Sequence, residues 1–356
     1  MLPKKGSSKP APAPKTPAQK GVRVLVLEDS SFRHAKPSEA IFDCVASVIS
    51  LAVDILECTP SVSILLSIMK QVKIHRKDVL WLQNLDSSGL NDAVYQYLSQ
   101  IRASFPHVLV SDKFGMQTKN GRTNKRNCKE AFDPKAAAAI ELNAMLVNRL
   151  VTTYTSLKST DSTIIRTRFR TLHVRLSLTI AHELVHVFNH YIVRNQRRHT
   201  PPKVTAGGYG NSKVGESGRF WEKELTGGVV DIRLSENDTE MVALRDDQLG
   251  KCWRLLEKVI DGLLARDFKN SLQAEGDMLT DREHQNVLAE HISPMRWTTR
   301  YRDMFPEKLE GPEELNTSLI DELVGPEIRK KPKYNISGQN ARKFAIQPRT
   351  VSHLIC

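Results

Sequence analysis

The chain has 356 residues, 40% of them apolar and 26% charged, a balance typical of globular proteins with a sizeable core. Its five cysteines are scattered without a CxxC pair, a pattern that suggests neither a disulfide framework nor a zinc ribbon. No apolar stretch reaches the roughly 20 residues of a membrane span, and the N-terminus lacks an apolar signal region. We therefore expect an intracellular protein, cytoplasmic or nuclear, that does not associate with membranes.

The net charge of +12 is concentrated at the two ends of the chain. Residues 1–22 carry five lysines, residues 329–356 carry seven basic residues, and neither segment has an acidic one. Segments of such composition bury too little apolar surface to order themselves. We expect two solvated basic tails. Contact of these tails with nucleic acid or with an acidic partner is the alternative.

Apolar periodicity predicts most elements in the first half of the chain. The expected helices cover residues 39–58, 61–72 and 90–101. A short strand is expected over His107–Ser111, and another over Ala138–Leu142. Between them, residues 117–129 are basic and rich in Asn and Gly, which favours an exposed loop. Asn143 is expected to cap a helix that reaches about Tyr154.

A long helix is expected from about Ser162, with Asp161 or Ser162 as its N-cap. Its apolar stripe keeps the helical period and continues into His-Glu-Leu-Val-His at residues 182–186. The elements expected after it are a helix over 216–226, a hairpin of strands 229–234 and 241–244, and an amphipathic helix over 248–264.

Together these elements predict a mainly helical α+β protein with a small antiparallel sheet beside the helix that holds residues 182–186. The expected parts are a basic tail (1–22), an N-terminal helical region packed on the core (23–135), a catalytic core (136–268), a C-terminal region (269–328) and a second basic tail (329–356).

Residues 182–186 carry an H-E-x-x-H motif, which is typical of zinc hydrolases. On a helix, His182 and His186 lie on one face about 6 Å apart along the axis, so both imidazoles can bind one zinc ion. Glu183 can approach the open coordination position and act as the base toward the attacking water. His190 lies about 12 Å along the axis from His182, too far to share the ion.

A catalytic zinc site needs a third protein ligand, and the helix over 216–226 is its expected source. Glu222 is preferred because its neighbours on the same helix face include Gly218 and Leu225, which suit burial. The neighbours of Glu216 include Lys223, which suits burial less well. Glu216 is therefore the runner-up, and two ordinary surface glutamates are the alternative.

Hydrolysis of a peptide bond also requires a group that stabilises the oxyanion of the tetrahedral intermediate. Tyr209, in the loop over residues 205–212, is the nearest candidate in the sequence. A loop tyrosine without a catalytic role is the alternative.

An H-E-x-x-H helix followed 30 to 36 residues later by a glutamate-bearing helix resembles the glutamate-ligand zincins, or gluzincins. Within them, the string TPP…GESGRFWEKELTGG is similar to uncharacterised fungal proteins with an H-E-x-x-H helix. The resemblance covers roughly residues 138–231. It implies a zinc metallopeptidase with an antiparallel edge strand that aligns the substrate, for which Ala138–Leu142 is the candidate. Thr226 stands where thermolysin-like enzymes have an aspartate, which leaves the orientation of the histidines without its usual partner.

The sequence thus favours an intracellular zinc metallopeptidase acting on a peptide or protein substrate. A DNA-associated protease is one alternative, favoured by the basic tails and by Lys119–Lys129, but the chain lacks the cysteine-based zinc module that SprT-like proteases often carry. The other alternative is a metal-stabilised or degenerate scaffold that binds partners through its tails and hydrolyses nothing.

Overall fold

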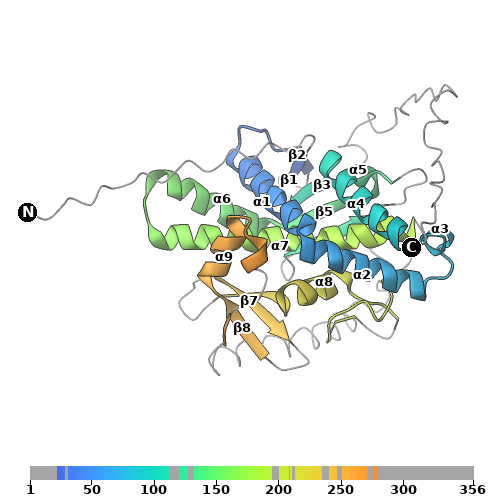
Figure 1. Ribbon diagram of the computed structural model, residues 1–356. Coiled ribbons are helices and arrows are strands. Elements are labelled where there is room, and N and C mark those ends of the chain that lie inside the picture. The colour runs from blue at the N-terminus through green and yellow to red at the C-terminus, as the bar shows by residue number, and fades with distance from the viewer. Residues whose placement is uncertain are drawn as a thin grey trace, which may run out of the picture. The chain divides into compact units, whose positions relative to one another are not determined.

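The computed structural model describes residues 22–28, 31–112, 120–126, 132–194, 200–207, 209–210, 213–234, 240–246, 251–271 and 276–278. These residues form a mainly helical α+β protein, as predicted, and all belong to one compact unit (Figure 1). The basic tails lie outside the described residues apart from Val22, as does the chain beyond Met278. Among the described helices, none combines the length and apolar character needed to cross a membrane.

The longest helix among the described residues is α7, with 31 residues. In chain order they are α1 (Ala40–Glu57), α2 (Thr59–His75), α3 (Leu80–Gln83), α4 (Ser87–Ala103), α5 (Pro134–Ala137), α6 (Ala144–Ser159), α7 (Thr163–Val193), α8 (Ser217–Thr226), α9 (Glu257–Leu264) and α10 (Phe268–Ser271). The helices expected over 39–58, 61–72, 90–101 and 216–226, and those after Asn143 and Ser162, are confirmed.

A five-stranded sheet has the order β2-β1-β3-β5-β4. Its strands are β1 (Val24–Glu28), β2 (Ser31–His34), β3 (His107–Ser111), β4 (Gly121–Lys125) and β5 (Ala138–Asn143). The inner strands β1, β3 and β5 run parallel, and β2 and β4 pair antiparallel at the edges. The expectation of an antiparallel sheet is thus wrong for this sheet, because helical connections such as α1–α4 bring successive strands back in the same direction.

A second sheet is antiparallel, with the order β6-β7-β8-β9. Its strands are β6 (Val229–Leu234), β7 (Glu240–Asp246), β8 (Lys251–Leu255) and β9 (Gly276–Met278). The predicted hairpin of β6 and β7 is confirmed. The helix expected over 248–264 is wrong in its first half, where β8 pairs with β7, and only α9 is helical.

Helix α7 lies at the centre of the described residues, in contact with α1, α6, α8 and β4 (Figure 1). From Thr171 to Val193 every side chain is buried except that of His186. Ser162 caps its N-terminus by accepting a hydrogen bond from the backbone N–H of Ile165. At the other end, the Trp81 indole N–H donates to the carbonyl of Ile192, which would otherwise have no intrahelical donor.

Strand β4 is the edge of the sheet nearest α7, and sequence patterns did not reveal it. Residues 117–129 were expected to form an exposed loop, and Ala138–Leu142 to form the edge strand. In the structure, β5 lies between β3 and β4 and is wholly buried, so β4 is the edge strand instead. Its sequence, GRTNK, has no apolar alternation, and the strand forms through its pairing with β5 and its contact with α7.

Gly121 allows the close approach of β4 to α7. A Cβ atom at this position would lie 2.7 Å from Cγ2 of Thr179 and 3.4 Å from Cγ of Glu183. We expect Gly121→Ala to lower the free energy of unfolding by about 1–3 kcal/mol, because the added methyl pushes the strand off the helix. Alanine has a higher intrinsic strand propensity than glycine, so propensity alone predicts that Gly121→Ala raises the free energy of unfolding. Urea denaturation of the variant measures the change.

A second substitution provides the control for this prediction. Thr179→Ser removes Cγ2 but keeps the hydroxyl that donates to the carbonyl of Arg175. The double variant should therefore recover much of the stability that Gly121→Ala loses. A stable single variant, or a loss that Thr179→Ser does not relieve, would show that the contact is unimportant.

Candidate metal centre

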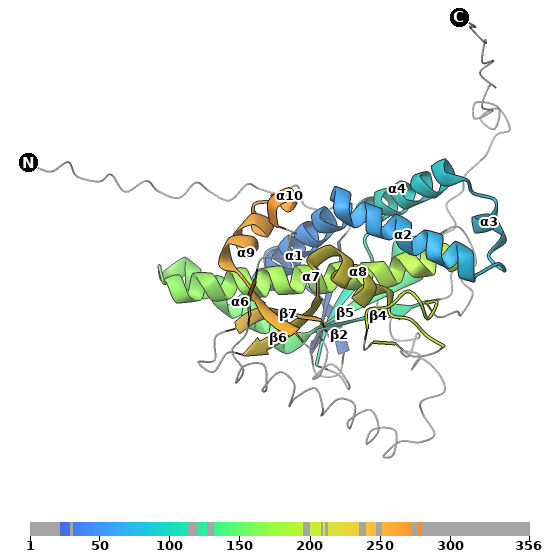
Figure 2. The same cartoon turned by 60° about the horizontal axis from the view of Figure 1, so that its bottom comes forward.

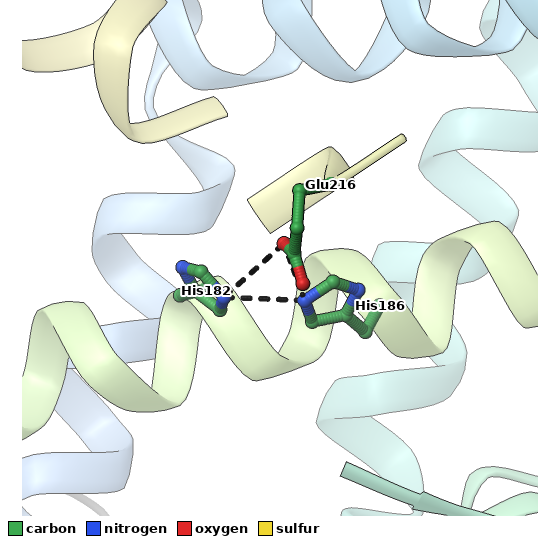
Figure 3. Close-up of side chains that lie close together, drawn as sticks. All are labelled: His182, His186 and Glu216. Carbon is green, nitrogen blue, oxygen red and sulfur yellow. Dashed lines mark hydrogen bonds and ion pairs between the residues drawn. The ribbon is translucent and has the colours of Figure 1, made fainter. Parts of the chain in front are cut away.

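Helix α7 presents His182 and His186 on one face, as their spacing predicts. The two Nε2 atoms are 3.1 Å apart, and the rings meet edge to face with centroids 4.9 Å apart. Figure 3 shows both Nε2 atoms turned toward the same point. The backbone between the two histidines is held by a hydrogen bond from outside the helix. The buried hydroxyl of Tyr97 donates to the carbonyl of Leu184 at 2.5 Å.

Glu216 completes this cluster from the residue before α8. Its Oε2 lies 3.1 Å from Nε2 of His186 and 3.8 Å from Nε2 of His182 (Figure 3). Among the described residues, His182, His186 and Glu216 form a group whose ligand atoms all lie within 4.8 Å of one another. The sequence-based order of preference is therefore reversed: Glu216, the runner-up, lies where a third ligand would be.

Two glycines make room for this arrangement. A Cβ at Gly215 would lie 2.1 Å from the carbonyl oxygen of Pro201, so a side chain there would displace the loop that leads to Glu216. A Cβ at Gly218 would lie 2.4 Å from Nε2 of His182. Helix α8 lies against α7 (Figure 2). The absence of a side chain at residue 218 allows this close approach.

Glu222 lies behind His182, on its other ring nitrogen. Its Oε1 is 2.8 Å from Nδ1 of His182, and its Oε2 accepts hydrogen bonds from Arg219 at 2.9 Å and from the backbone N–H of Val230 at 3.2 Å. The side chain is buried, both of its oxygens accept hydrogen bonds, and it lies outside the group formed by His182, His186 and Glu216. Glu222 is instead the acidic hydrogen-bond partner of His182. Thermolysin-like enzymes have an aspartate for this role, and Thr226 stands at the corresponding position here. Such a carboxylate orients a ligating histidine and makes it more basic.

His186 also has a hydrogen-bond partner on its other ring nitrogen, a hydroxyl at a longer distance. Its Nδ1 lies 3.4 Å from the hydroxyl of Ser217, the first residue of α8. That hydroxyl accepts in turn from Thr200, which also accepts a hydrogen bond of 3.2 Å from the buried amide of Asn189. These contacts tie the loop before α8 to α7, and neither Ser217 nor Thr200 stands out in the sequence.

Burial and charge act on this cluster in opposite directions. Burial lowers the pKa of His182, but the charge and hydrogen bond of Glu222 outweigh it and leave the pKa raised. Burial raises the pKa of Glu216, and the two histidines and Arg219 outweigh it, so this carboxyl's pKa is lowered. Arg219 likewise holds the pKa of buried Glu222 below its usual value. Both carboxylates therefore remain ionised at neutral pH.

Glu183, the expected base, is buried beside the cluster. Its Oε2 accepts a hydrogen bond of 2.6 Å from the hydroxyl of Thr123 on β4. The same hydroxyl is 3.0 Å from the backbone carbonyl of Glu183, so β4 fixes both the side chain and the helix turn. Thr123 was not expected from the sequence, because its segment was interpreted as a loop.

His190 and Tyr209, which the sequence analysis considered for roles in the site, lie apart from the cluster. His190 contacts the carbonyl oxygen of Arg126 through Nε2 at 2.9 Å, and burial lowers its pKa to about 4. The ring of Tyr209 lies 5.2 Å from the guanidinium of Arg219, and its hydroxyl accepts a hydrogen bond from Arg245. No described contact joins Tyr209 to the two histidines, and its oxyanion role stays a prediction.

The three facing atoms fit a metal ion. If Nδ1 of His182 donates to Glu222, its Nε2 presents a lone pair toward the Nε2 of His186 and the Oε2 of Glu216. Within the described residues that buried oxygen has no hydrogen-bond donor apart from Nε2 of His186 at 3.1 Å, which donates only when it carries a proton. In their unprotonated forms, three acceptors so close together repel unless a cation lies among them. Tetrahedral zinc ligands at about 2.1 Å are about 3.4 Å from one another, which matches the observed separations.

Comparisons of the chain with protein-family models, curated proteins and solved structures gave no match. The zincin resemblance of the motif therefore stays a prediction. A function has to be inferred from the cluster itself and from the side chains that orient it.

The roles of the two glutamates can be separated by a matched pair of variants. Glu216→Gln should weaken zinc binding by more than the roughly 10- to 100-fold loss expected when an orienting residue such as Glu222 is changed to Gln. Competition with a chromophoric chelator measures both affinities. A larger loss in Glu222→Gln than in Glu216→Gln would reinstate Glu222 as the ligand.

Gly218→Ala should abolish zinc binding without removing any ligand, because the new methyl would displace the ring of His182. Zinc content of the purified variant, together with circular dichroism to show that it is folded, measures the effect. Exposed Glu224 on the same helix provides the control, since Glu224→Ala should bind zinc normally. A Gly218→Ala protein with a full complement of zinc would contradict the geometry.

Proposed function

We propose that the protein is a zinc-dependent hydrolase of peptide bonds, a metallopeptidase, that uses a metal-activated water. The supporting observation is the cluster of His182, His186 and Glu216, whose two histidines lie on the same stretch of α7 as the buried carboxylate of Glu183. Two imidazoles and one carboxylate are a donor set that zinc enzymes use with an open fourth position. Structural zinc sites usually have four protein ligands, and the described residues supply three, which favours a catalytic site.

Zinc, when bound there, would polarise a water molecule and lower its pKa to about 7. The chain's own residues would do the proton chemistry. Thr123 occupies Oε2 of Glu183 and fixes its orientation, while the described residues give Oε1 no hydrogen bond. Oε1 can therefore accept the proton of the attacking water as the water oxygen bonds to the carbonyl carbon. The same carboxyl then returns the proton to the amide nitrogen as the C–N bond breaks.

The alternatives from the sequence have no observation of their own among the described residues. The non-catalytic scaffold depends on the basic tails, which lie outside those residues apart from Val22. The DNA-associated protease depends on the tails and on Lys119–Lys129, and the described part of that segment forms β4, where Arg122 is bound to Glu141. A scaffold also gives no reason for a base to be oriented beside three ligands. Peptide hydrolysis is therefore the function that the arrangement favours.

Glu183→Gln should separate catalysis from metal binding. We expect the variant to keep about one zinc per chain, because residue 183 is not a ligand, and to hydrolyse a mixed peptide library at least about 100-fold more slowly than the wild type. His186→Ala should lose both zinc and activity. Mass spectrometry of the cleaved peptides and elemental analysis measure the two quantities. A zinc-loaded wild-type protein that cleaves no peptide, or a Glu183→Gln variant of full activity, would contradict the proposal.

A further inference from the structure

Strand β4 directs alternate side chains toward α7. Gly121 lies close to Thr179 and Glu183, and the hydroxyl of Thr123, two residues on, donates to Glu183. Side chains of a strand alternate with a period of two, so Lys125 shares the face of Gly121 and Thr123. The next residues on the other face, Arg122 and Asn124, contact the carboxylate of Glu141 on β5 instead.

The position of Lys125 along α7 follows from its neighbours on the strand. Thr123 contacts Glu183, and the carbonyl of Arg126 contacts His190. Lys125 therefore lies between these two contacts, alongside the turn of α7 that carries His186. Its ammonium group interacts electrostatically with two carboxylates of the candidate metal centre, those of Glu216 and Glu183.

The Lys125 side chain is exposed to solvent, although the surrounding protein partly desolvates its ammonium group. Burial by the surrounding protein lowers the pKa of its ammonium, against the opposing effect of Glu216 and Glu183. Within the described residues it forms neither a hydrogen bond nor an ion pair at contact distance. Arg219, another cation near the centre, is already bound to Glu222 and to the carbonyl of Val230. Lys125 is thus a cation that is available to a bound molecule.

We propose that Lys125 binds the oxygen of the substrate that becomes negatively charged during hydrolysis, an inference that rests on the proposed function. As the water oxygen bonds to the carbonyl carbon and its proton passes to Glu183, the electron pair of the C=O double bond moves to the carbonyl oxygen. That oxygen would develop its charge between the base and the metal ligands, where the ammonium of Lys125 interacts electrostatically with Glu183 and Glu216. A preorganised cation at this point stabilises the transition state more than the uncharged substrate.

This assignment differs from the sequence-based candidate for the same role. Tyr209 packs against Arg219, and its hydroxyl is engaged by Arg245. Lys125 comes from the edge strand and interacts with the base and a ligand together. A charged donor is also the stronger partner for an oxyanion, since hydrogen bonds between ions are about twice as strong as neutral ones.

Binding of methylphosphonate, a tetrahedral anion, to the zinc-loaded protein tests the proposal without a known substrate. Isothermal titration calorimetry compares the wild type with Lys125→Met, Lys125→Arg and Lys203→Met, the last removing an exposed lysine from the loop before Glu216. Loss of one charge-assisted hydrogen bond should weaken binding about 10- to 100-fold in Lys125→Met. Lys125→Arg should stay within about threefold of the wild type, and Lys203→Met should be unchanged.

Zinc affinity, measured by chelator competition, gives a second readout. Lys125→Met should bind zinc at least as tightly as the wild type, because it removes a positive charge near the ion. Equal phosphonate affinity of zinc-loaded wild type and Lys125→Met would overturn the role of Lys125 and leave the zinc hydrolase standing, as would a zinc-loaded wild type that binds no phosphonate. A wild-type protein that binds no zinc would overturn the proposed function, and the role of Lys125 with it.

Discussion

The mutual repulsion of three acceptors, two imidazole nitrogens and one carboxylate oxygen, dominates the interior beside α7. His182, His186 and Glu216 bring these atoms to within 3.1–3.8 Å of one another. Holding them there costs free energy unless a cation lies among them. The surrounding structure opposes their separation, since Glu222 fixes one imidazole and Gly218 lets α8 approach it. The proposed metal ion would offset that cost.

The rest of the fold supports this cluster by packing against α7 on several sides. Helices α1 and α6, helix α8 and strand β4 all contact it, so its central turns have no solvent-exposed face except at His186. Two of these elements, α8 and β4, also contribute to the site. Helix α8 follows the third ligand and carries the orienting carboxylate, and β4 carries the threonine that fixes Glu183. Sites built on packed elements keep their geometry better than sites on loops.

Local patterns in the sequence were sufficient for those parts of the site that lie on one helix. The i, i+4 spacing of His182 and His186 and the cap at Ser162 were predicted, because helix geometry determines them. The sequence favoured Glu222 over Glu216 because the preference rested on the helix face that suits burial, whereas the structure groups Glu216 with the two histidines. Glu222 is indeed buried, but it contacts the far nitrogen of His182. Strand β4 was missed because its residues form a strand only through pairing with β5, a tertiary contact that its local sequence does not record.

The binding of zinc by His182, His186 and Glu216 can be tested by a crystal structure of the zinc-loaded protein, with anomalous scattering recorded at the zinc absorption edge. The account predicts a single strong anomalous peak about 2.1 Å from Nε2 of His182, Nε2 of His186 and Oε2 of Glu216, with Glu222 on the opposite nitrogen of His182. A peak coordinated by Glu222, or no peak between the two histidines at neutral pH with zinc present, would contradict it.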